Sequence, residues 1–300
     1  MSAENFPPHI ADWIHYLGEQ GRSPRTVANY ALDLRDFCRW YRASEGTDPL
    51  PSSVLPRDIE DYKAYLQTIR RAAPRTVNRR LAALSHFFKW AFQNGLARKD
   101  PTAGVRFLRL PPRKPRALSP REERRLRRAV EAGGSARDRA VIEVLLGTGL
   151  RVEELLALRR GDVELHPRSG VLIVRRGKGG TTRRVPLTAS VRRALGAYLE
   201  ALGDLPEDAP LWQGTRGPLR DRGAVGRMLE KYARLAGLEG VTPHVLRHTF
   251  ATRYLEANPG DLRGLAALLG HASLNTVMVY TEPAEEDLLE KMERMGVVGR

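Results

Sequence analysis

PRTVANYALDLRDFCRW, residues 24–40, aligns without a gap on PRTVNRRLAALSHFFKW, residues 74–90. Pro, Arg, Thr, Val, Leu, Phe and Trp recur at the same places in both copies. Each copy opens with Pro near the first helical position and then spaces its apolar residues along one face of a helix. Two copies are too few for a solenoid, which needs at least ~3 repeats. The echo therefore predicts two similar helices inside one compact domain.

Two more apolar stripes at helical spacing accompany the repeated segments, and they comprise Ile10, Trp13, Ile14 and Leu17, and Ile59, Tyr62, Leu66 and Ile69. Residues 1–97 are therefore predicted to form a four-helix domain. Arg25 and Thr26 begin one repeated helix, and Arg75 and Thr76 begin the other. Free backbone N–H groups and the helix dipole favour phosphate at such ends, so these four residues are candidate phosphate contacts. The alternative is that PRTV is only a good helix start, and the sequence leaves both interpretations open.

The chain is strongly basic. Its 300 residues carry 50 basic and 35 acidic side chains, a formal net charge of +15, and 43 of the basic residues are arginine. The arginine fork suits bidentate phosphate contacts. A GC-rich genome would inflate arginine without any function, but it would not explain the net excess. The excess is +8 in residues 1–115 (19 basic, 11 acidic) and +7 in residues 116–300 (31 basic, 24 acidic), which favours nucleic acid over a membrane surface or an acidic protein.

Length and composition exclude several other classes. A chain of 300 residues suits two domains of ordinary size. No apolar run approaches the ~20 residues that a membrane span needs, and the N-terminus MSAENFPPHI lacks the features of a signal peptide. We therefore expect a cytoplasmic protein with no membrane partner. The single cysteine, Cys38, excludes a disulfide framework and a multi-thiolate zinc site, and its place on an apolar stripe predicts burial.

A basic, Pro-rich segment separates the two halves of the chain. Residues 98–128 carry 12 basic and three acidic side chains, with LPPRKPRALSP in the middle. Three prolines favour an extended path, so residues 98–118 are predicted to be a domain linker. Arg113 and Lys114 in this linker are candidate contacts to a phosphate backbone. Ser119 and Glu122 form a capping box that starts the next helix.

The second half, residues 119–300, is predicted to be mostly helical with a small antiparallel sheet. Most of it shows helical spacing of apolar residues. The apolar run VLIV at 171–174 and a second strand candidate at 184–187 are joined by a Gly-rich turn, which is typical of a hairpin.

Common cofactor motifs are missing from this half. A phosphate-binding loop ending in Gly177 and Lys178 would need Gly at position 172, where Leu172 stands. His244 and His248 are four residues apart, but the sequence between them lacks the Glu of a zinc protease. No acidic cluster has the pattern of a two-metal site. We therefore expect neither a metal nor a nucleotide cofactor.

The remaining candidates are cationic and hydrogen-bonding residues at turns and helix ends: Arg151 with Glu154, Lys178, His244 with Arg247, His271 and Tyr280. Together they have the chemistry that metal-free cleavage of a phosphodiester requires. A pair of arginines neutralises the transition state, and a protonated lysine gives a proton to the leaving alkoxide. A tyrosine acts as the nucleophile if an imidazole helps to remove its proton.

Each candidate also has an ordinary structural interpretation. Arg151 can form an intrahelical ion pair, Lys178 can be an exposed lysine at a hairpin tip, His271 can cap a helix, and Tyr280 can belong to the core. The order and spacing of the whole set decide between the two interpretations.

Four segments in order carry a resemblance to a known family: GTGLRVEELLALRRGDV at 147–163, RRGKGGTTRRVPL at 175–187, TPHVLRHTFATRYL at 242–255 and LAALLGHASLNTVMVYT at 265–281. They resemble the signature segments of the tyrosine recombinases, the lambda-integrase family, and are most similar to its Xer-type members. The N-terminal half resembles the helical core-binding, SAM-like domain of this family, with its pattern at Thr26, Tyr30, Phe37 and Trp40.

The resemblance implies a role for each candidate in a C-terminal catalytic domain. Tyr280 would attack the scissile phosphate to give a 3′-phosphotyrosyl link, and Lys178 would protonate the leaving 5′-oxygen. Arg151 and Arg247 would bind the non-bridging oxygens. His244 would transfer protons, and His271 would hydrogen-bond the phosphate. Glu154 would orient the site without reacting.

The resemblance also implies the partners. Two domains would clamp duplex DNA at specific recombination sites, as a homo-tetramer or a hetero-tetramer with a related recombinase, with a DNA translocase as a further possible partner. Glu282 follows Tyr280-Thr281 where Xer proteins commonly have His, which shifts the balance from chromosome-dimer resolution and partition toward phage or mobile-element integration. The acidic segment 282–300 is expected to dock on a neighbouring protomer. A type IB topoisomerase and a non-catalytic DNA-binding accessory protein are the alternative functions.

Overall fold

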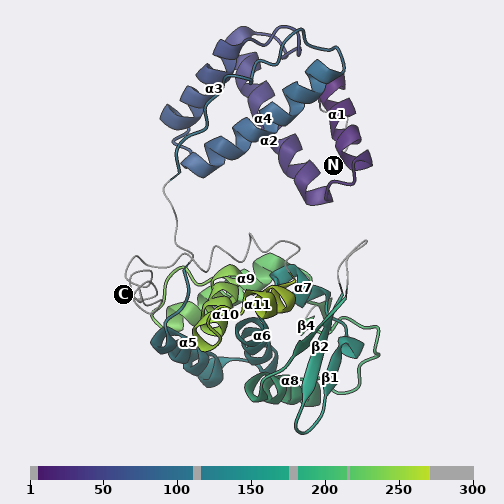
Figure 1. The fold of residues 1–300 in the computed structure, drawn as a ribbon, viewed down its shortest axis with the longest axis vertical. Coiled ribbons are helices and arrows are strands. Elements are labelled where there is room, and N and C mark those ends of the chain that lie inside the picture. The colour runs from purple at the N-terminus through teal and green to yellow at the C-terminus, as the bar shows by residue number, and fades with distance from the viewer. Residues whose placement is uncertain (1–5, 111–115, 176–181, 215–216, 271–300) are drawn as a thin grey trace, which may run out of the picture. The chain divides into compact units, whose positions relative to one another are not determined.

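The computed structural model describes residues 6–110, 116–175, 182–214 and 217–270, which belong to two compact units, Met1–Arg113 and Lys114–Arg300 (Figure 1). Both units are mostly helical, and the small antiparallel sheets lie in the second unit, as the sequence predicts. Among the described residues, no helix has both the length and the apolar character that crossing a bilayer requires.

The first unit consists of α1 (Pro8–Glu19), α2 (Pro24–Glu45), α3 (Pro56–Thr68) and α4 (Pro74–Gln93). Each helix begins with proline, whose fixed φ suits the first turn and whose missing N–H costs nothing there. The repeated helices are α2 and α4, and equivalent residues face the core: Leu34 and Leu84, and Phe37 and Phe87, are all buried. The predicted four-helix domain is confirmed.

Aromatic packing and ion pairs tie the helices of the first unit together. The ring of Phe37 meets Tyr62 edge-on, with centroids 5.2 Å apart, and the Tyr62 hydroxyl donates to Asp36 at 2.9 Å. Asp36 also pairs with Arg80, so α2, α3 and α4 meet at one carboxylate. Cys38 is buried as predicted, and burial raises the pKa of its thiol to about 12.

One residue of a predicted apolar stripe in this unit is exposed, and part of the predicted linker is packed. Ile69 is the C-cap residue of α3 and is 71% exposed, so the apolar stripe of this helix is buried only as far as Leu66. Leu108 packs against the core of the first unit, and its N–H and C=O pair with the Asn78 side chain at 2.8 Å each. At the other end Leu118 is buried in the second unit and donates its N–H to Thr249.

The second unit contains α5 (Pro120–Gly133), α6 (Ala136–Thr148), α7 (Val152–Ala157), the 3-10 turn η2 (Arg160–Asp162), β1 (Val163–Leu165), β2 (Gly170–Val174), β3 (Arg183–Pro186), α8 (Ala189–Leu202), β4 (Gln213–Gly214), β5 (Gly217–Pro218), α9 (Arg222–Leu235), α10 (Pro243–Ala257) and α11 (Leu262–Leu269). Strands β1, β2 and β3 form an antiparallel sheet in that order, with Leu172 opposite Val185. The hairpin is confirmed, while β1 and the short pair β4–β5 were not predicted.

Helix α6 is the centre of the second unit, with α8 and α10 packed against it (Figure 1). Most of its side chains are buried, including Val141, Ile142 and Val144. The helix ends at Gly149, which adopts a left-handed φ of 62°. A Cβ there would lie 2.4 Å from Phe250 and 2.8 Å from Leu269, so only glycine fits this turn. The turn directs the next residues, Leu150 and Arg151, toward α10 and the end of α11.

Candidate active site

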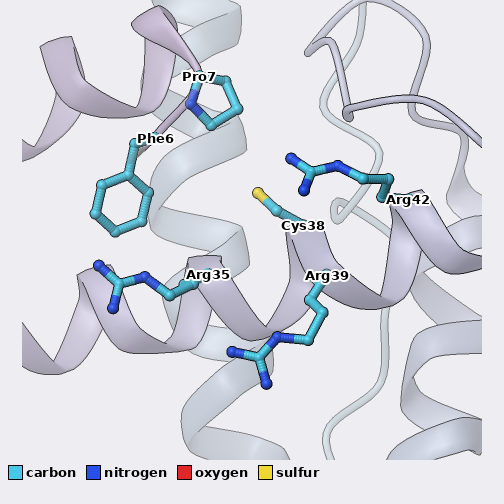
Figure 2. Close-up of a pocket in the computed structure, with 6 residues that line it drawn as sticks. All are labelled: Phe6, Pro7, Arg35, Cys38, Arg39 and Arg42. Atoms are coloured by element: carbon cyan, nitrogen blue, oxygen red, sulfur yellow. The ribbon is translucent and has the colours of Figure 1, made fainter. Parts of the chain in front are cut away.

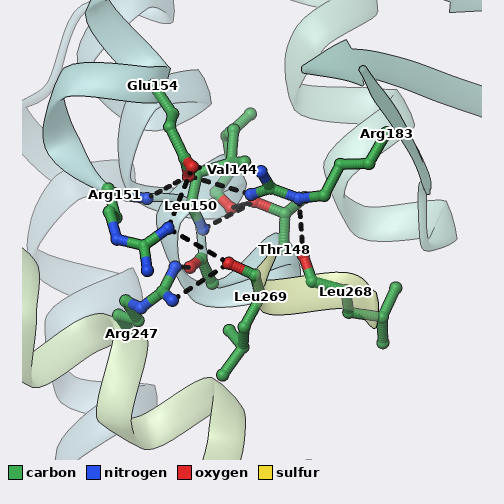
Figure 3. Close-up of polar contacts among 10 residues, drawn as sticks. Val144, Thr148, Leu150, Arg151, Glu154, Arg183, Arg247, Leu268 and Leu269 are labelled. Carbon is green, nitrogen blue, oxygen red and sulfur yellow. Dashed lines mark hydrogen bonds and ion pairs between the residues drawn. The ribbon is translucent and has the colours of Figure 1, made fainter. Parts of the chain in front are cut away.

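Arg151 occupies the N-cap position of α7, and Glu154 in the first turn anchors it. The Arg151 N–H donates to Glu154 Oε2 at 2.9 Å, and its Nη1 donates to Oε1 at 3.1 Å. The backbone and the guanidinium of Arg151 are therefore positioned by one carboxylate (Figure 3). The Arg151 side chain remains 40% exposed, which leaves it accessible to a ligand.

A third residue, Arg183 at the start of β3, completes the ion-pair cluster. It donates Nη1 to Glu154 Oε1 at 3.0 Å and Nη2 to Oε2 at 2.9 Å, a bidentate pair with both side chains 12% exposed. Burial alone would raise the pKa of Glu154. The hydrogen bonds from Arg183 and the Arg151 backbone, with the two guanidinium charges, outweigh burial and lower the pKa to about 2. Glu154 is thus ionised at any physiological pH and does not act as an acid.

Arg247 comes from α10 and is 3% exposed. Its Nη1 donates to the carbonyl of Gly149 at 2.6 Å, and its Nη2 donates to the carbonyl of Leu269 at 3.1 Å. The same Leu269 carbonyl accepts from Arg151 Nη1 at 3.3 Å (Figure 3). The two guanidinium groups, 96 positions apart in the sequence, therefore converge on one backbone oxygen at the C-terminal end of α11, where the helix dipole favours positive charge.

His244 lies one turn before Arg247 on α10. Desolvation by nearby protein atoms, and then the charges of Arg247 and Arg151, lower the pKa of this exposed imidazole below its usual value. Its ring meets that of His248 edge-on, with centroids 4.3 Å apart. Burial, and then the charges of His244 and Arg247, lower the pKa of His248 to about 4. Both rings are therefore neutral at pH 7.

The arrangement gathers two cations and a neutral imidazole, of which Arg151 and His244 are accessible to an anion. Repulsion between Arg151 and Arg247 is offset by Glu154 and by the Leu269 carbonyl that both arginines share. An anion bound between them would remove what repulsion remains. Within the described part of the chain, no group of three or more His, Cys, Asp or Glu residues is arranged to bind a metal ion. The two arginines and the imidazole instead suit electrostatic stabilisation and proton transfer at a phosphate.

The structure thus brings together four of the predicted residues: Arg151, Glu154, His244 and Arg247. Lys178, His271 and Tyr280 lie outside the described residues, as do the linker candidates Arg113 and Lys114.

Sequence reasoning missed Arg183. Its only local signal is the strand alternation: Val185 is buried, so Arg183, two residues earlier, points to the same face, while Arg184 points to solvent. An arginine on the inner face of a strand requires an acidic partner, and the sequence alone does not identify Glu154 as that partner.

The candidate phosphate contacts of the first unit lie at the first turns of α2 and α4, as predicted. Arg25 and Arg75 are exposed, and neither forms an ion pair with another described residue. Ser23 caps α2 by accepting from the Thr26 N–H at 3.1 Å, and its hydroxyl also bonds that of Thr26 at 2.8 Å. Thr76 is half-buried at the start of α4.

A small basic pocket lies elsewhere on α2, and its lining residues are Phe6, Pro7, Arg35, Cys38, Arg39 and Arg42 (Figure 2). Its volume is about 230 Å³. The Arg35 guanidinium lies over the Phe6 ring, 4.8 Å from the centroid, and Arg42 pairs with Asp48. With its thiol pKa raised by burial, Cys38 in this pocket is not a nucleophile.

Comparisons with known proteins show the family of this chain. Residues 116–287 match the model of the phage integrase family, and residues 10–98 match that of the phage integrase N-terminal SAM-like domain. The chain is 38% identical to tyrosine recombinase XerC of Methylobacterium sp. (strain 4-46), over 95% of this chain and 91% of that protein. It is 36% identical to tyrosine recombinase XerD of Ralstonia nicotianae, over 90% and 87%.

Solved structures share the fold. The crystal structure of XerA recombinase is 30% identical, with a TM-score of 0.53, covering 97% of this chain and 98% of that one. XerH recombinase bound to its difH substrate has a TM-score of 0.74 at 21% identity, covering 99% and 85%. With two domain models matching nearly the whole chain and curated relatives above 30% identity, the chain belongs to the phage integrase family of tyrosine recombinases.

Proposed function

We propose that the chain is a site-specific recombinase that cuts and rejoins duplex DNA through a covalent 3′-phosphotyrosyl intermediate. The observation that carries this proposal is the convergence of Arg151 and Arg247 on the Leu269 carbonyl, with His244 beside them. Two guanidinium groups at one point match the non-bridging oxygens of a single phosphodiester.

The chemistry follows from the residue types. The Tyr280 oxygen attacks phosphorus as the bond to the 5′-oxygen breaks, so one phosphodiester replaces another. The tyrosine proton passes to a base, and His244 suits that role because its lowered pKa keeps it neutral at pH 7. Lys178 gives a proton to the leaving 5′-oxygen, and His271 hydrogen-bonds the phosphate. Because the bond energy is conserved, no nucleotide cofactor is required, and a second 5′-hydroxyl reverses the step.

Electrostatics supports DNA as the partner of both units. The excess of basic residues is divided almost evenly, +8 before residue 116 and +7 from there on, as a clamp that contacts DNA with two domains requires. In the first unit, Arg25, Thr26, Arg75 and Thr76 are the proposed phosphate contacts. In the basic segment that joins the units, Arg113 and Lys114 have the same proposed role.

The proposed assembly and biological role are taken from those of the related Xer recombinases. By analogy with the Xer recombinases, we propose a tetramer on two DNA sites, of this chain alone or with a related recombinase, acting in the cytoplasm. Chromosome-dimer resolution with a DNA translocase and integration of a mobile element are the two candidate roles. The relatives named XerC and XerD support the first.

The test of this function first identifies the DNA site that the chain binds. Fragmented genomic DNA of the source organism is passed over the immobilised chain, and the enriched duplex defines the selected site. Two labelled duplexes carrying that site should exchange strands in the presence of EDTA, because no metal takes part. A type IB topoisomerase would instead relax supercoiled DNA that lacks the site and exchange no strands. A non-catalytic accessory protein would bind the site without cutting it.

A further inference from the structure

We propose that Arg183 is a positioning residue for strand cleavage, which fixes Arg151 relative to the C-terminal end of α11. This inference rests on the proposed function. Arg183 begins β3, five positions after Lys178 in the sequence, and the mechanism above gives it no chemical step. Its effect is exerted through Glu154 and through the backbone of α11.

All three guanidinium nitrogens of Arg183 donate hydrogen bonds to groups distant in sequence. Nη1 and Nη2 donate to the two oxygens of Glu154 at 3.0 and 2.9 Å, and Nε donates to the carbonyl of Leu268 at 2.9 Å. Figure 3 shows the fork of Arg183 between the carboxylate and the end of α11. One side chain therefore fixes β3, α7 and α11 with respect to one another.

These contacts close a ring. Arg183 binds Glu154, Glu154 binds the backbone and guanidinium of Arg151, and Arg151 binds the carbonyl of Leu269, the residue after Leu268. Because Arg247 also donates to Leu269, the position of that carbonyl sets the distance between the two phosphate-binding arginines. Loss of Arg183 opens this ring and leaves Arg151 to link Glu154 and the end of α11 without the support of Arg183.

The turn after α11 is shaped around the same guanidinium. Gly270 adopts a left-handed φ of 64°, and a Cβ on it would lie 2.6 Å from Arg183 Nη1 and 2.9 Å from its Cζ. The backbone that leads into His271 thus passes directly against Arg183. Close approach of backbone to a rigid side chain is a position that selects for glycine.

A lysine cannot replace this arginine. Its single ammonium is a point charge, whereas the two oxygens of Glu154 and the carbonyl of Leu268 need donors in three fixed directions. We therefore expect Arg183→Lys to keep the charge and lose the geometry. This distinguishes positioning from a general need for positive charge.

The experiment measures single-turnover cleavage and DNA affinity separately, on nicked duplexes of the selected site. Arg183→Met and Arg183→Lys should each slow cleavage by about 10²-fold while the Kd for DNA changes less than about threefold, as expected when a reacting group is misplaced. The matched control is Arg184→Met, the next residue on the same strand, which pairs with Glu164 at the surface and should cleave at the wild-type rate.

A pH profile separates positioning from a merely structural role. Arg183 helps to lower the pKa of Glu154, so its removal moves the titration of Glu154 upward, toward the ordinary range of a carboxyl. Cleavage by Arg183→Met should therefore fall more steeply than that of the wild type between pH 6 and pH 4, around the ordinary carboxyl pKa of 4.5, where Glu154 of the wild type stays ionised. The double variant Arg183→Met with Glu154→Gln, which has no carboxyl at position 154, should lack the added fall.

Wild-type cleavage rates in Arg183→Lys, or an Arg183→Met profile parallel to the wild type, would overturn the proposal. If Arg183→Met does not fold, as judged by circular dichroism, the lysine variant carries the test. Failure of the proposed function looks different: the wild-type chain itself would then form no covalent adduct on the selected site.

Discussion

The carboxylate of Glu154 offers a quantitative test of the ion-pair cluster, through the variant Glu154→Gln. The pKa of Glu154 is lowered from an ordinary 4.5 to about 2. At ~1.4 kcal/mol for each pKa unit, the shift corresponds to about 3 kcal/mol of stabilisation of the folded state. Because Arg151 is 40% exposed and solvent screens its charge, we expect the measured loss in Glu154→Gln to be about 1–2 kcal/mol at pH 7.

The lowered pKa of Glu154 also predicts how its stabilising effect changes with pH. A carboxyl whose pKa is lowered in the folded state stabilises fully above pH 4.5, and this contribution is lost as the pH falls toward 2. The difference between wild type and Glu154→Gln should therefore be largest at pH 7 and shrink by half or more at pH 3.

Hydrogen exchange of the α6 amides is the assay, because most of α6 is buried in the core of the second unit and its exchange reports on that unit alone. The control is Glu164→Gln, a surface carboxylate 37% exposed, which should change the exchange free energy by less than about 0.5 kcal/mol. A difference for Glu154→Gln that is absent at pH 7, or is as large at pH 3 as at pH 7, would refute the reasoning.

Three further predictions concern the turn, the base and the DNA contacts. Gly149→Ala should lower the free energy of unfolding of the second unit by about 2 kcal/mol more than Gly260→Ala, as measured by urea denaturation. Both glycines have positive φ, but of the two only Gly149 lacks space for a Cβ. Equal losses in the two variants would contradict the crowding argument. His244→Gln should slow single-turnover cleavage by about 10²-fold or more. Wild-type cleavage should persist to a lower pH than an ordinary histidine permits and then fall as His244 is protonated, whereas the variant should lack this fall. Arg25→Ala and Arg75→Ala should each reduce the log–log salt slope of DNA binding by ~0.9, measured by fluorescence anisotropy, and an unchanged slope would remove that residue from the interface.

The local features of the fold could be predicted from sequence. The repeat at 24–40 and 74–90 predicted two helices whose equivalent residues Leu34 and Leu84 share the core, because helical spacing and a proline start are properties of neighbouring residues. The short strands β1, β4 and β5 have at most three residues each, too few to show alternation. Ile69 continues the apolar stripe of α3 in the sequence but lies at the C-cap and is exposed, which the spacing alone does not reveal.

In the candidate site, too, local pairs could be predicted from sequence and long-range contacts could not. Arg151 with Glu154, and His244 with Arg247, are pairs within one turn of a helix, and a local pattern identified them. Arg183 reaches Glu154 across 29 positions and Leu268 across 85, contacts that only the folded chain reveals. The shared carbonyl of Leu269 belongs to the backbone, so no residue type marks it in the sequence.

The most direct test of the central claim, that this chain is a tyrosine recombinase, is the chemical identity of its bond to DNA. A nicked duplex of the selected site is incubated with the chain in EDTA, and the protein–DNA adduct is digested and sequenced by mass spectrometry. We predict a 3′-phosphotyrosyl link on Tyr280, and no adduct with Tyr280→Phe, which should still bind the site with unchanged affinity. An adduct formed by Tyr280→Phe, or a link to any other residue, would contradict the account.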